Sequence, residues 1–269
     1  MNLGLNKKIA LVAGSSHGIG RAIAKTLISE GAQVIICGRD KSALATTKKE
    51  FLNIKGPGRV LGVYTVQATD QKSVRSLFKQ IRAKFKNLDI LVNSIGGVEK
   101  FGTIADLKDS DWENAWKLNF LSAEYFCEEA IPLLKKSSVG KIVNIASMAG
   151  LQPGRFNPHY SAAKAALLNY TKHLANELAP YNILANSICP NSMSGHRWQL
   201  NIADGAKRLN ISLEQAEKDM LIQEQKKNPL GRIGSEEDIA YLTAFLVSDK
   251  AQFITGESFR VDGGASRSL

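Results

Sequence analysis

Two residues in the stretch HYSAAK have the spacing of a proton donor and the group that tunes it. Tyr160 and Lys164 are four residues apart in a segment with helical spacing, so both side chains would lie on one face of a helix. A tyrosine ordinarily has a pKa of about 10, and a neighbouring ammonium lowers it by favouring the phenolate. The pair would suit general acid–base chemistry, although two surface side chains on neighbouring turns share the same spacing.

Two further polar residues precede this pair in the chain. Ser147 lies thirteen residues before Tyr160, directly after an apolar run, and Asn119 stands in the stretch KLNF. A hydroxyl at the end of a strand can hold a substrate oxygen by hydrogen bonding while charge develops on it. Each residue alone also has a structural explanation, Ser147 as a strand-end hydroxyl and Asn119 as an amide that bends a helix.

A glycine-rich stretch, AGSSHGIG, ends the apolar run Ile9 to Ala13 and opens a segment with helical spacing. Gly14, Gly18 and Gly20 stand where the backbone of a dinucleotide site turns sharply and approaches a pyrophosphate. The position between strand and helix makes the glycine spacing informative, because a tight turn without a ligand can also contain glycines. The candidate cofactor-binding residues here are Gly14, Ser15, Ser16, His17, Gly18, Ile19 and Gly20.

The end of the second expected strand, ICGRD, indicates which dinucleotide would bind. An NAD site usually has an acidic residue there that accepts hydrogen bonds from the adenosine ribose, but this chain has Gly38 followed by Arg39. A guanidinium matches a 2′-phosphate in geometry and charge. Asp40 is one position late for the acidic role and is also placed to pair with Arg39. We therefore expect NADP(H) rather than NAD(H).

Short β-branched runs alternate with longer amphipathic segments along the chain. Continuous apolar strands separated by helices indicate a parallel sheet covered on both faces. We therefore predict a doubly wound α/β (Rossmann) fold of about seven strands in a single domain spanning residues 1–269. The expected strands are 8–13, 33–37, 59–66, 89–93, 139–146, 183–189 and 257–261, and the expected helices are 18–30, 41–53, 71–86, 111–135, 158–179 and 235–248.

Residues 191–232 interrupt this alternation with a long polar, partly helical insertion. A connection of this length in a compact domain is usually functional or flexible, so we expect a substrate lid. The alternative is a pair of ordinary packing helices, in which Met193 and Trp198 anchor the insertion.

The composition sets limits on class and location. No run of eighteen apolar residues occurs, so a membrane-spanning helix is not expected. Cys37, Cys127 and Cys189 are widely spaced in apolar runs, which indicates buried thiols in a reducing compartment and neither a disulfide framework nor a metal site. We expect a soluble, cytoplasmic protein.

The formal charge of +10 arises from 35 Lys and Arg against 25 Asp and Glu. The basic residues are scattered, so a nucleic-acid surface is disfavoured. A generally basic surface is the simplest explanation, and the alternative is a local patch that attracts a phosphorylated cofactor or an acidic carrier protein.

In order and on the expected elements, these motifs resemble those of the short-chain dehydrogenase/reductase family. The matching features are the glycine spacing, NSIG at 93–96, Asn119, Ser147 and the Tyr160/Lys164 pair, and the resemblance runs from about residue 6 to VDGG at 261–264. It implies that the cofactor carries the hydride while the protein supplies orientation and the proton.

By this resemblance, Asn119, Ser147, Tyr160 and Lys164 form the catalytic set. Tyr160 would be the general acid for carbonyl reduction and the base for alcohol oxidation, Lys164 would also bind the nicotinamide ribose, and Asn119 would hold a water that links Lys164 to solvent. Asp70 would contact the adenine; the alternative is that it caps the helix that begins near residue 71. The remaining residues expected to line the cofactor site are Asn93, Gly96 and Pro190.

The chain departs from the family pattern at three places. Ala13 stands where the family commonly has a threonine, whose hydroxyl ties the turn to the sheet. In NSIG, Ser94 and the bulkier Ile95 replace Asn and Ala. Asn191 follows Pro190 where the family has glycine, and an asparagine tolerates left-handed backbone, which would preserve the turn. These changes affect substrate and affinity rather than the reaction class.

Ligands of open α/β sheets bind outside the carboxyl ends of the strands. His159 adjoins Tyr160, but neighbours on a helix point apart, so we expect a structural role for it. The apolar character of the remaining set suits an acyl chain, a ring or another neutral carbonyl compound. The residues expected to face the substrate are Gly97, Val98, Met148, Gln152, Phe156, Met193 and Trp198.

The expected function is hydride transfer from NADPH to a ketone, and 3-oxoacyl-carrier-protein reductases are common relatives of this type. The alternative within the class is an NAD(P)-dependent dehydrogenase of a sugar, steroid or secondary-metabolite alcohol. An alternative of another class is a non-catalytic NADP sensor, for which a proton relay has no use. By resemblance we also expect a homotetramer or dimer, formed through the helices at 111–135 and 158–179 and the last strand.

Overall fold

The centre of the fold is a sheet of seven parallel strands in the order β3-β2-β1-β4-β5-β6-β7. A computed structural model describes residues 2–266. The strand order reverses between β1 and β4, and the crevice at such a reversal is the usual ligand site of doubly wound sheets. The prediction of a doubly wound parallel α/β fold is confirmed. The strands are β1 Ile9–Ala13, β2 Gln33–Gly38, β3 Arg59–Thr65, β4 Ile90–Asn93, β5 Gly140–Ile145, β6 Ile183–Pro190 and β7 Ser258–Val261.

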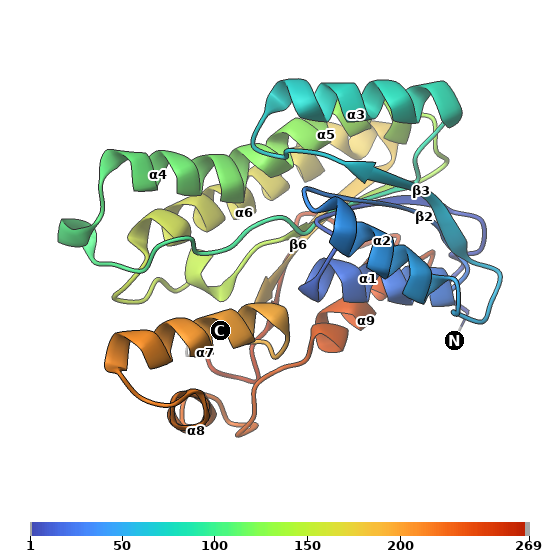
Figure 1. Ribbon diagram of the computed structural model, residues 1–269. Helices are drawn as coiled ribbons and strands as arrows, with labels where there is room; N and C mark the ends of the chain where they lie inside the picture. The colour runs from blue at the N-terminus through green and yellow to red at the C-terminus, as the bar shows by residue number, and fades with distance from the viewer. Residues whose placement is uncertain (1, 267–269) are drawn as a thin grey trace.

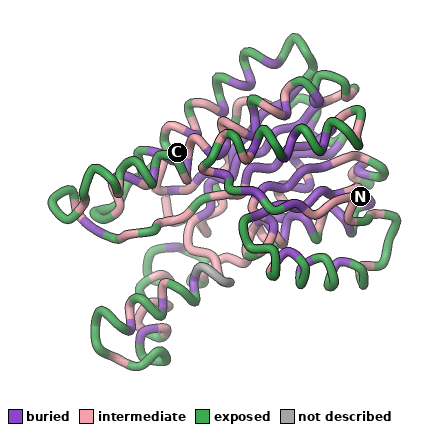
Figure 2. Tube along the Cα trace, turned by 45° about the horizontal axis from the view of Figure 1, so that its top comes forward, coloured by how far each residue is buried: buried purple, intermediate pink, exposed green. Residues whose placement is uncertain are grey.

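Helices cover both faces of this sheet (Figure 1). Side chains of a strand point alternately to its two faces, and in β1 Leu11 and Ala13 pack in the layer of α3, α5 and α6 while Ala10 and Val12 pack in the layer of α1, α2 and α9. The buried residues accordingly concentrate in and around the sheet (Figure 2). The helices of these layers are α1 Gly18–Ser29, α2 Lys41–Phe51, α3 Gln71–Lys84, α4 Asp109–Trp116, α5 Ser122–Leu134, α6 Pro158–Leu178 and α9 Glu236–Leu246.

Capping side chains fix where several helices begin. The Asp40 carboxylate accepts from the amides of residues 42 and 43 and starts α2, and the Asp70 carboxylate accepts from the Lys72 amide and starts α3. In α6, Pro158 occupies the first turn after Asn157, whose backbone is left-handed at φ 67°. This sharp entry sets the position of Tyr160 in the first turn of α6.

The helix expected over 111–135 is wrong as a single α-helix. A π-helical turn, Lys117–Leu121, separates α4 from α5. The Asn119 side-chain amide donates to the Ala115 carbonyl at 3.1 Å, four residues earlier, where the helical ladder would place a backbone amide. A side chain inserted into the ladder is a known cause of such irregularity, and π-helical turns occur frequently at functional sites.

The insertion at 191–232 forms two helices, α7 His196–Leu209 and α8 Leu213–Gln225. They extend away from the layered body (Figure 1) and share a small core of Trp198, Ile202, Ala206 and Ala216. At the base of the insertion, the Ser194 amide donates to the Gly234 carbonyl at 2.8 Å. The insertion is therefore a helical pair that is hydrogen-bonded to the body at its base, where the Leu230 amide also donates to the Gly263 carbonyl.

Cys37, Cys127 and Cys189 are all buried and unpaired, as the sequence predicted for thiols in apolar runs. Within residues 2–266, no helix is both long enough and apolar enough to cross a membrane.

Candidate active site

The glycine-rich turn after β1 lies at the strand-order reversal. Gly14 and Gly18 have positive φ values of 80° and 60°, which glycine adopts without strain. A Cβ on Gly14 would lie 2.7 Å from the Ser94 carbonyl oxygen, so the turn after β1 packs tightly on the segment after β4. A Cβ on Gly20 would collide with the Gly14 carbonyl. Gly14 and Gly20 are therefore needed for the close packing of the turn on β4 and α1, and Gly18 for its positive φ.

Ser15 joins this turn to the neighbouring strand. Its hydroxyl accepts from the Cys37 amide at 3.0 Å and lies 3.3 Å from the Cys37 carbonyl oxygen, and the residue is completely buried. Ala13 lacks the hydroxyl that the family pattern uses to tie the turn to the sheet, and the Ser15 hydroxyl makes such a tie to β2. The Ser15 side chain is thus committed to the turn, and so is its amide, which donates to the Cys37 carbonyl at 3.1 Å.

The amino end of α1 suits an anion. Among the described residues, His17 at the N-cap makes no side-chain capping bond and the first turn holds no acidic residue, whereas α2 and α3 begin with a capping aspartate. Backbone amides at a helix start attract phosphate. Pyrophosphate binding by residues 14–20 stays a prediction, with which this charge pattern is consistent.

Arg39 lies exposed at the end of β2, where a 2′-phosphate is expected. The neighbouring Asp40 does not pair with it, because the Asp40 carboxylate caps α2 through Ser42 and Ala43. These hydrogen bonds hold the pKa of Asp40 below its ordinary value. Gly38 lets the Ser16 side chain lie close to the end of β2, since a Cβ at position 38 would lie 3.2 Å from the Ser16 hydroxyl oxygen. The Arg39 guanidinium is therefore available to bind a 2′-phosphate.

Lys164 is buried on α6 behind Tyr160. Its Nζ donates to the Ile145 carbonyl at 2.8 Å and lies 5.9 Å from the centroid of the Tyr160 ring. Burial lowers the Lys164 pKa to about 8. The pair therefore shares one helix face, as its spacing predicted, and Lys164 remains mainly protonated at neutral pH.

Asn119 and Lys164 converge on Gly96. A Cβ on Gly96 would lie 2.8 Å from the Asn119 Oδ1 and 2.9 Å from the Lys164 Nζ. Asn119 also holds the backbone after β4, because its Oδ1 accepts from the Gly97 amide at 2.8 Å and its Nδ2 donates to the Gly97 carbonyl at 3.1 Å. The π-helical turn, α6 and the segment after β4 are therefore fixed to one another at this point.

Ser147 follows β5 and caps the short 3-10 turn Met148–Gly150, since its hydroxyl accepts from the Ala149 amide at 3.1 Å. The hydroxyl proton is not used in that bond and can be donated to a ligand. A Cβ on Gly150 would lie 2.8 Å from the Lys164 carbonyl carbon. The turn that carries Ser147 thus packs directly against the helix that carries Tyr160 and Lys164.

Three other predicted cofactor residues lie at the same edge of the sheet, and each has a different structural role. Asn93 is buried and its amide donates to the Asn144 Oδ1 at 2.8 Å, so its side chain braces β4 against β5. Asp70 caps α3, which was the structural alternative for it. Pro190 ends β6, and Asn191 continues the ladder by donating to the Val261 carbonyl at 3.1 Å. Asn191 is not among the described residues with positive φ, so the expected left-handed turn is not formed there.

The predicted substrate residues all follow the carboxyl ends of β4, β5 and β6. Phe156 is exposed and Met148 is buried. Trp198 is buried in the core that α7 shares with α8, which corresponds to the anchoring alternative. The residues exposed or partly exposed at this edge are Gly97, Val98, Gln152, Phe156 and Met193.

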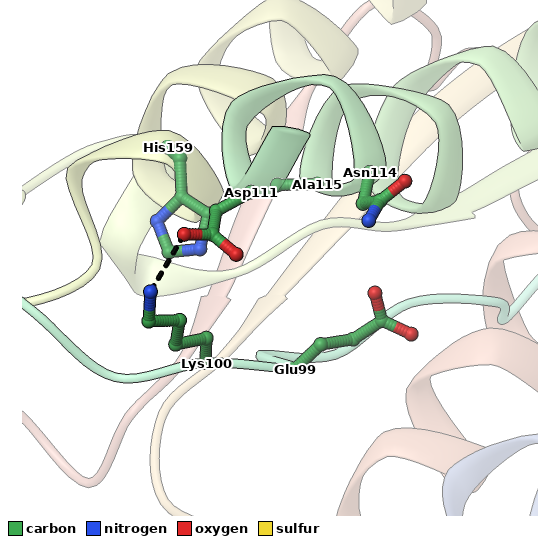
Figure 3. Close-up of a pocket in the computed structure, with 6 residues that line it drawn as sticks. All are labelled: Glu99, Lys100, Asp111, Asn114, Ala115 and His159. Atoms are coloured by element: carbon green, nitrogen blue, oxygen red, sulfur yellow. Dashed lines mark hydrogen bonds and ion pairs between the residues drawn. The ribbon is translucent and has the colours of Figure 1, made fainter. Parts of the chain in front are cut away.

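The sequence interpretation missed a polar pocket beside this set (Figure 3). Glu99 and Lys100 come from the segment after β4, Asp111 and Asn114 from α4, and His159 from α6. The only signal was the position of His159 next to Tyr160, because the other residues come together through the tertiary fold.

Comparison with known proteins places this geometry in a family context. The model of a family described as Enoyl-(Acyl carrier protein) reductase matches residues 13–266. The chain is 35% identical over 257 residues to the 3-oxoacyl-[acyl-carrier-protein] reductase FabG of Salmonella typhimurium, covering 96% of each chain.

Solved structures with the same fold include two reductases. L-sorbose reductase from Gluconobacter frateurii, complexed with NADPH and L-sorbose, superposes with a TM-score of 0.92 at 29% identity over 100% of each chain. A variant of actinorhodin polyketide ketoreductase with NADPH superposes with a TM-score of 0.88 at 26% identity, covering 97% of this chain and 98% of that chain.

Proposed function

The chain belongs to the short-chain dehydrogenase/reductase family, and from this premise we propose that it reduces a ketone with NADPH, with Tyr160 as the proton donor. The observation that carries the proposal is the convergence of Asn119 and Lys164 on Gly96, where a Cβ would lie 2.8 Å and 2.9 Å from their side-chain ends. A non-catalytic NADP sensor would have no use for this buried arrangement beside a tyrosine.

The residues divide the work of carbonyl reduction among them. The bound nicotinamide supplies the hydride. The Ser147 hydroxyl donates to the carbonyl oxygen and orients it, and Tyr160 gives the proton to that oxygen as charge develops on it. The Lys164 ammonium, protonated at neutral pH because its pKa is about 8, stabilises the phenolate that remains. Asn119 positions Gly97 and, through a water, would link Lys164 to solvent.

The cofactor is NADP(H) rather than NAD(H). Arg39 is exposed at the end of β2, and its acidic neighbour is occupied as a helix cap. The amino end of α1 receives the pyrophosphate. The two superposed reductases were both solved with NADPH, which supports the same choice.

The substrate proposed first is a 3-oxoacyl group. The relative from Salmonella typhimurium is named a 3-oxoacyl-[acyl-carrier-protein] reductase. The net charge of +10 favours encounter with an acidic carrier protein. A hydroxylated ketone is the second candidate, favoured by the superposition with L-sorbose reductase. We propose that the insertion at 191–232 is a lid over either substrate. We also propose that the chain is a single domain that works in the cytoplasm as a homotetramer or dimer.

A panel of carbonyl compounds assayed with NADPH and NADH side by side tests the proposed function. We expect NADPH-linked reduction with at least about a tenfold preference over NADH, which corresponds to about 1.4 kcal/mol and is within reach of one charge-assisted contact from Arg39. Turnover only in NAD-linked alcohol oxidation would favour a dehydrogenase. Tight NADP binding without turnover of any compound would favour the sensor.

A further inference from the structure

A pocket of about 150 Å³ lies beside the catalytic set, between the segment after β4 and the amino ends of α4 and α6 (Figure 3). Except for one alanine, its walls are polar or charged. Three of the lining side chains are acidic or basic, which suits a polar ligand better than an acyl chain. The lining residues are Glu99, Lys100, Asp111, Asn114, Ala115 and His159.

An ion pair is fixed in the wall of this pocket. The Lys100 Nζ lies 2.7 Å from the Asp111 Oδ2 and also donates to the Asp106 carbonyl at 3.1 Å. The Asp111 Oδ2 accepts from the Lys108 amide at 2.9 Å as well, and the hydrogen bond from Lys100 lowers the Asp111 pKa, so this group is a carboxylate at neutral pH. Within the described residues these contacts use Oδ2, which leaves Oδ1 able to accept from a ligand.

His159 adds an unused buried polar atom. It is only 4% exposed, its ring meets the Trp112 ring edge-on with centroids 6.0 Å apart, and its Nδ1 has no hydrogen-bond partner among the described residues. Burial lowers its pKa, so the ring is neutral at pH 7 and offers one donor and one acceptor. A buried polar atom without a partner costs about 1–3 kcal/mol. Nδ1 is not exposed to the pocket, so a polar ligand would partner it only after the ring turns.

The pocket is joined to the catalytic residues through backbone and hydrogen bonds. His159 directly precedes Tyr160. The Ala115 carbonyl accepts from the Asn119 amide at 3.1 Å. Asn119 also binds both backbone groups of Gly97, two residues before Glu99. The pocket therefore borders the backbone that carries the catalytic residues, although none of those residues lines it. A substrate held at Tyr160 would reach it by extending past Gly97.

The charges and hydrogen-bonding groups that line the pocket indicate which kind of ligand it can bind. Two carboxylates against one ammonium disfavour a phosphate or a carboxylate, and Lys100 disfavours a cation. A hydroxyl group both donates and accepts, so it can give its proton to Glu99 or Asp111 and receive one from Lys100 or Asn114. We propose that this pocket binds hydroxyl groups of the substrate, and that the protein therefore prefers a polyhydroxylated ketone, the second candidate above, to a 3-oxoacyl group. This inference rests on the proposed ketone reduction and names its substrate class.

Two open-chain ketones with the same carbon skeleton test the inference: erythrulose, with a hydroxyl on each carbon beside and beyond the carbonyl, and butanone, with none. Asn114→Leu and Glu99→Leu change exposed side chains in the pocket, so folding should be retained. Glu113→Leu is the matched control, because Glu113 lies on α4 outside the pocket and pairs with Lys117.

We expect the parent protein to reduce erythrulose with a kcat/KM at least about tenfold above that for butanone, and each pocket variant to raise the KM for erythrulose about tenfold. The kcat/KM for butanone should change by less than about twofold in all variants, and Glu113→Leu should alter neither substrate. Equal kinetics for the two ketones in the parent, or equal losses for both in the variants, would overturn the inference while leaving ketone reduction intact. Absence of NADPH-linked reduction of every carbonyl would instead refute the proposed function itself.

Discussion

Replacing Gly96 with alanine should separate Asn119 from Lys164. The added Cβ would lie 2.8 Å from the Asn119 Oδ1 and 2.9 Å from the Lys164 Nζ. Carbon atoms normally contact such atoms at about 3.5 Å or more, so both side chains must move. The hydrogen bonds that hold them, from the Gly97 amide to Asn119 and from Lys164 to the Ile145 carbonyl, are each 2.8 Å long.

The size of the effect follows from these two bonds. A neutral hydrogen bond contributes about 1 kcal/mol and one from a charged group about 1.5–3 kcal/mol. If both are lost from the catalytic arrangement, the barrier rises by about 2.5–4 kcal/mol, which lowers kcat/KM by about two to three orders of magnitude. The global stability should fall as well, because the φ of 155° at Gly96 is one that alanine adopts only with strain.

The assay is NADPH-linked reduction of the best carbonyl substrate, with NADPH affinity followed by fluorescence and unfolding by denaturant. Gly154→Ala is the matched control, because a Cβ at that exposed glycine meets no atom within 4 Å. We expect the control to behave as the parent does. If Gly96→Ala keeps kcat/KM within about threefold of the parent, the convergence of Asn119 and Lys164 is not important for the reaction.

Three further predictions concern the cofactor, the pH dependence and the turn. Arg39→Ala should reduce the preference for NADPH over NADH by about ten- to a hundredfold, the value of one charge-assisted contact, and an unchanged ratio would show that the 2′-phosphate is bound elsewhere. Because burial lowers the Lys164 pKa to about 8, the ammonium is present below that pH and lost above it, so kcat/KM for ketone reduction should fall as the pH rises through about 8; a profile that stays flat to about pH 10 contradicts this role. Ser15→Ala leaves the buried Cys37 amide without its partner and should lower the free energy of unfolding by about 1–3 kcal/mol in denaturant titrations, whereas equal stability of Ser15→Ala and Ser16→Ala would refute the proposed tie.

The sequence predicted the sheet and its ends well because each strand is a continuous apolar run bounded by polar or turn residues. All seven expected strands are present with ends that differ by at most one residue, for example the expected 33–37 against Gln33–Gly38. The starts of α2 and α3 can also be predicted from the sequence, because Asp40 and Asp70 are favourable N-cap residues that bond amides within a few residues of their own position. These are local signals.

Features that depend on contacts between residues far apart in the chain could not be predicted from the sequence. The break in the helix expected at 111–135 arises because Asn119 bonds both Ala115 in its own helix and Gly97 after β4. The inward orientation of Asn93 depends on Asn144 in the adjacent strand. The polar pocket depends on Lys100 and Asp111 meeting across a loop, which no periodicity reveals.

The most direct test of the account is Tyr160→Phe, which removes one hydroxyl and leaves the ring beside Lys164. We expect NADPH to bind with an affinity within about threefold of the parent, while kcat for reduction of the best carbonyl substrate falls by at least about two orders of magnitude, the usual contribution of a general acid. Carbonyl reduction by Tyr160→Phe at the parent rate, with NADPH bound equally well, would contradict the assignment of Tyr160 as the proton donor.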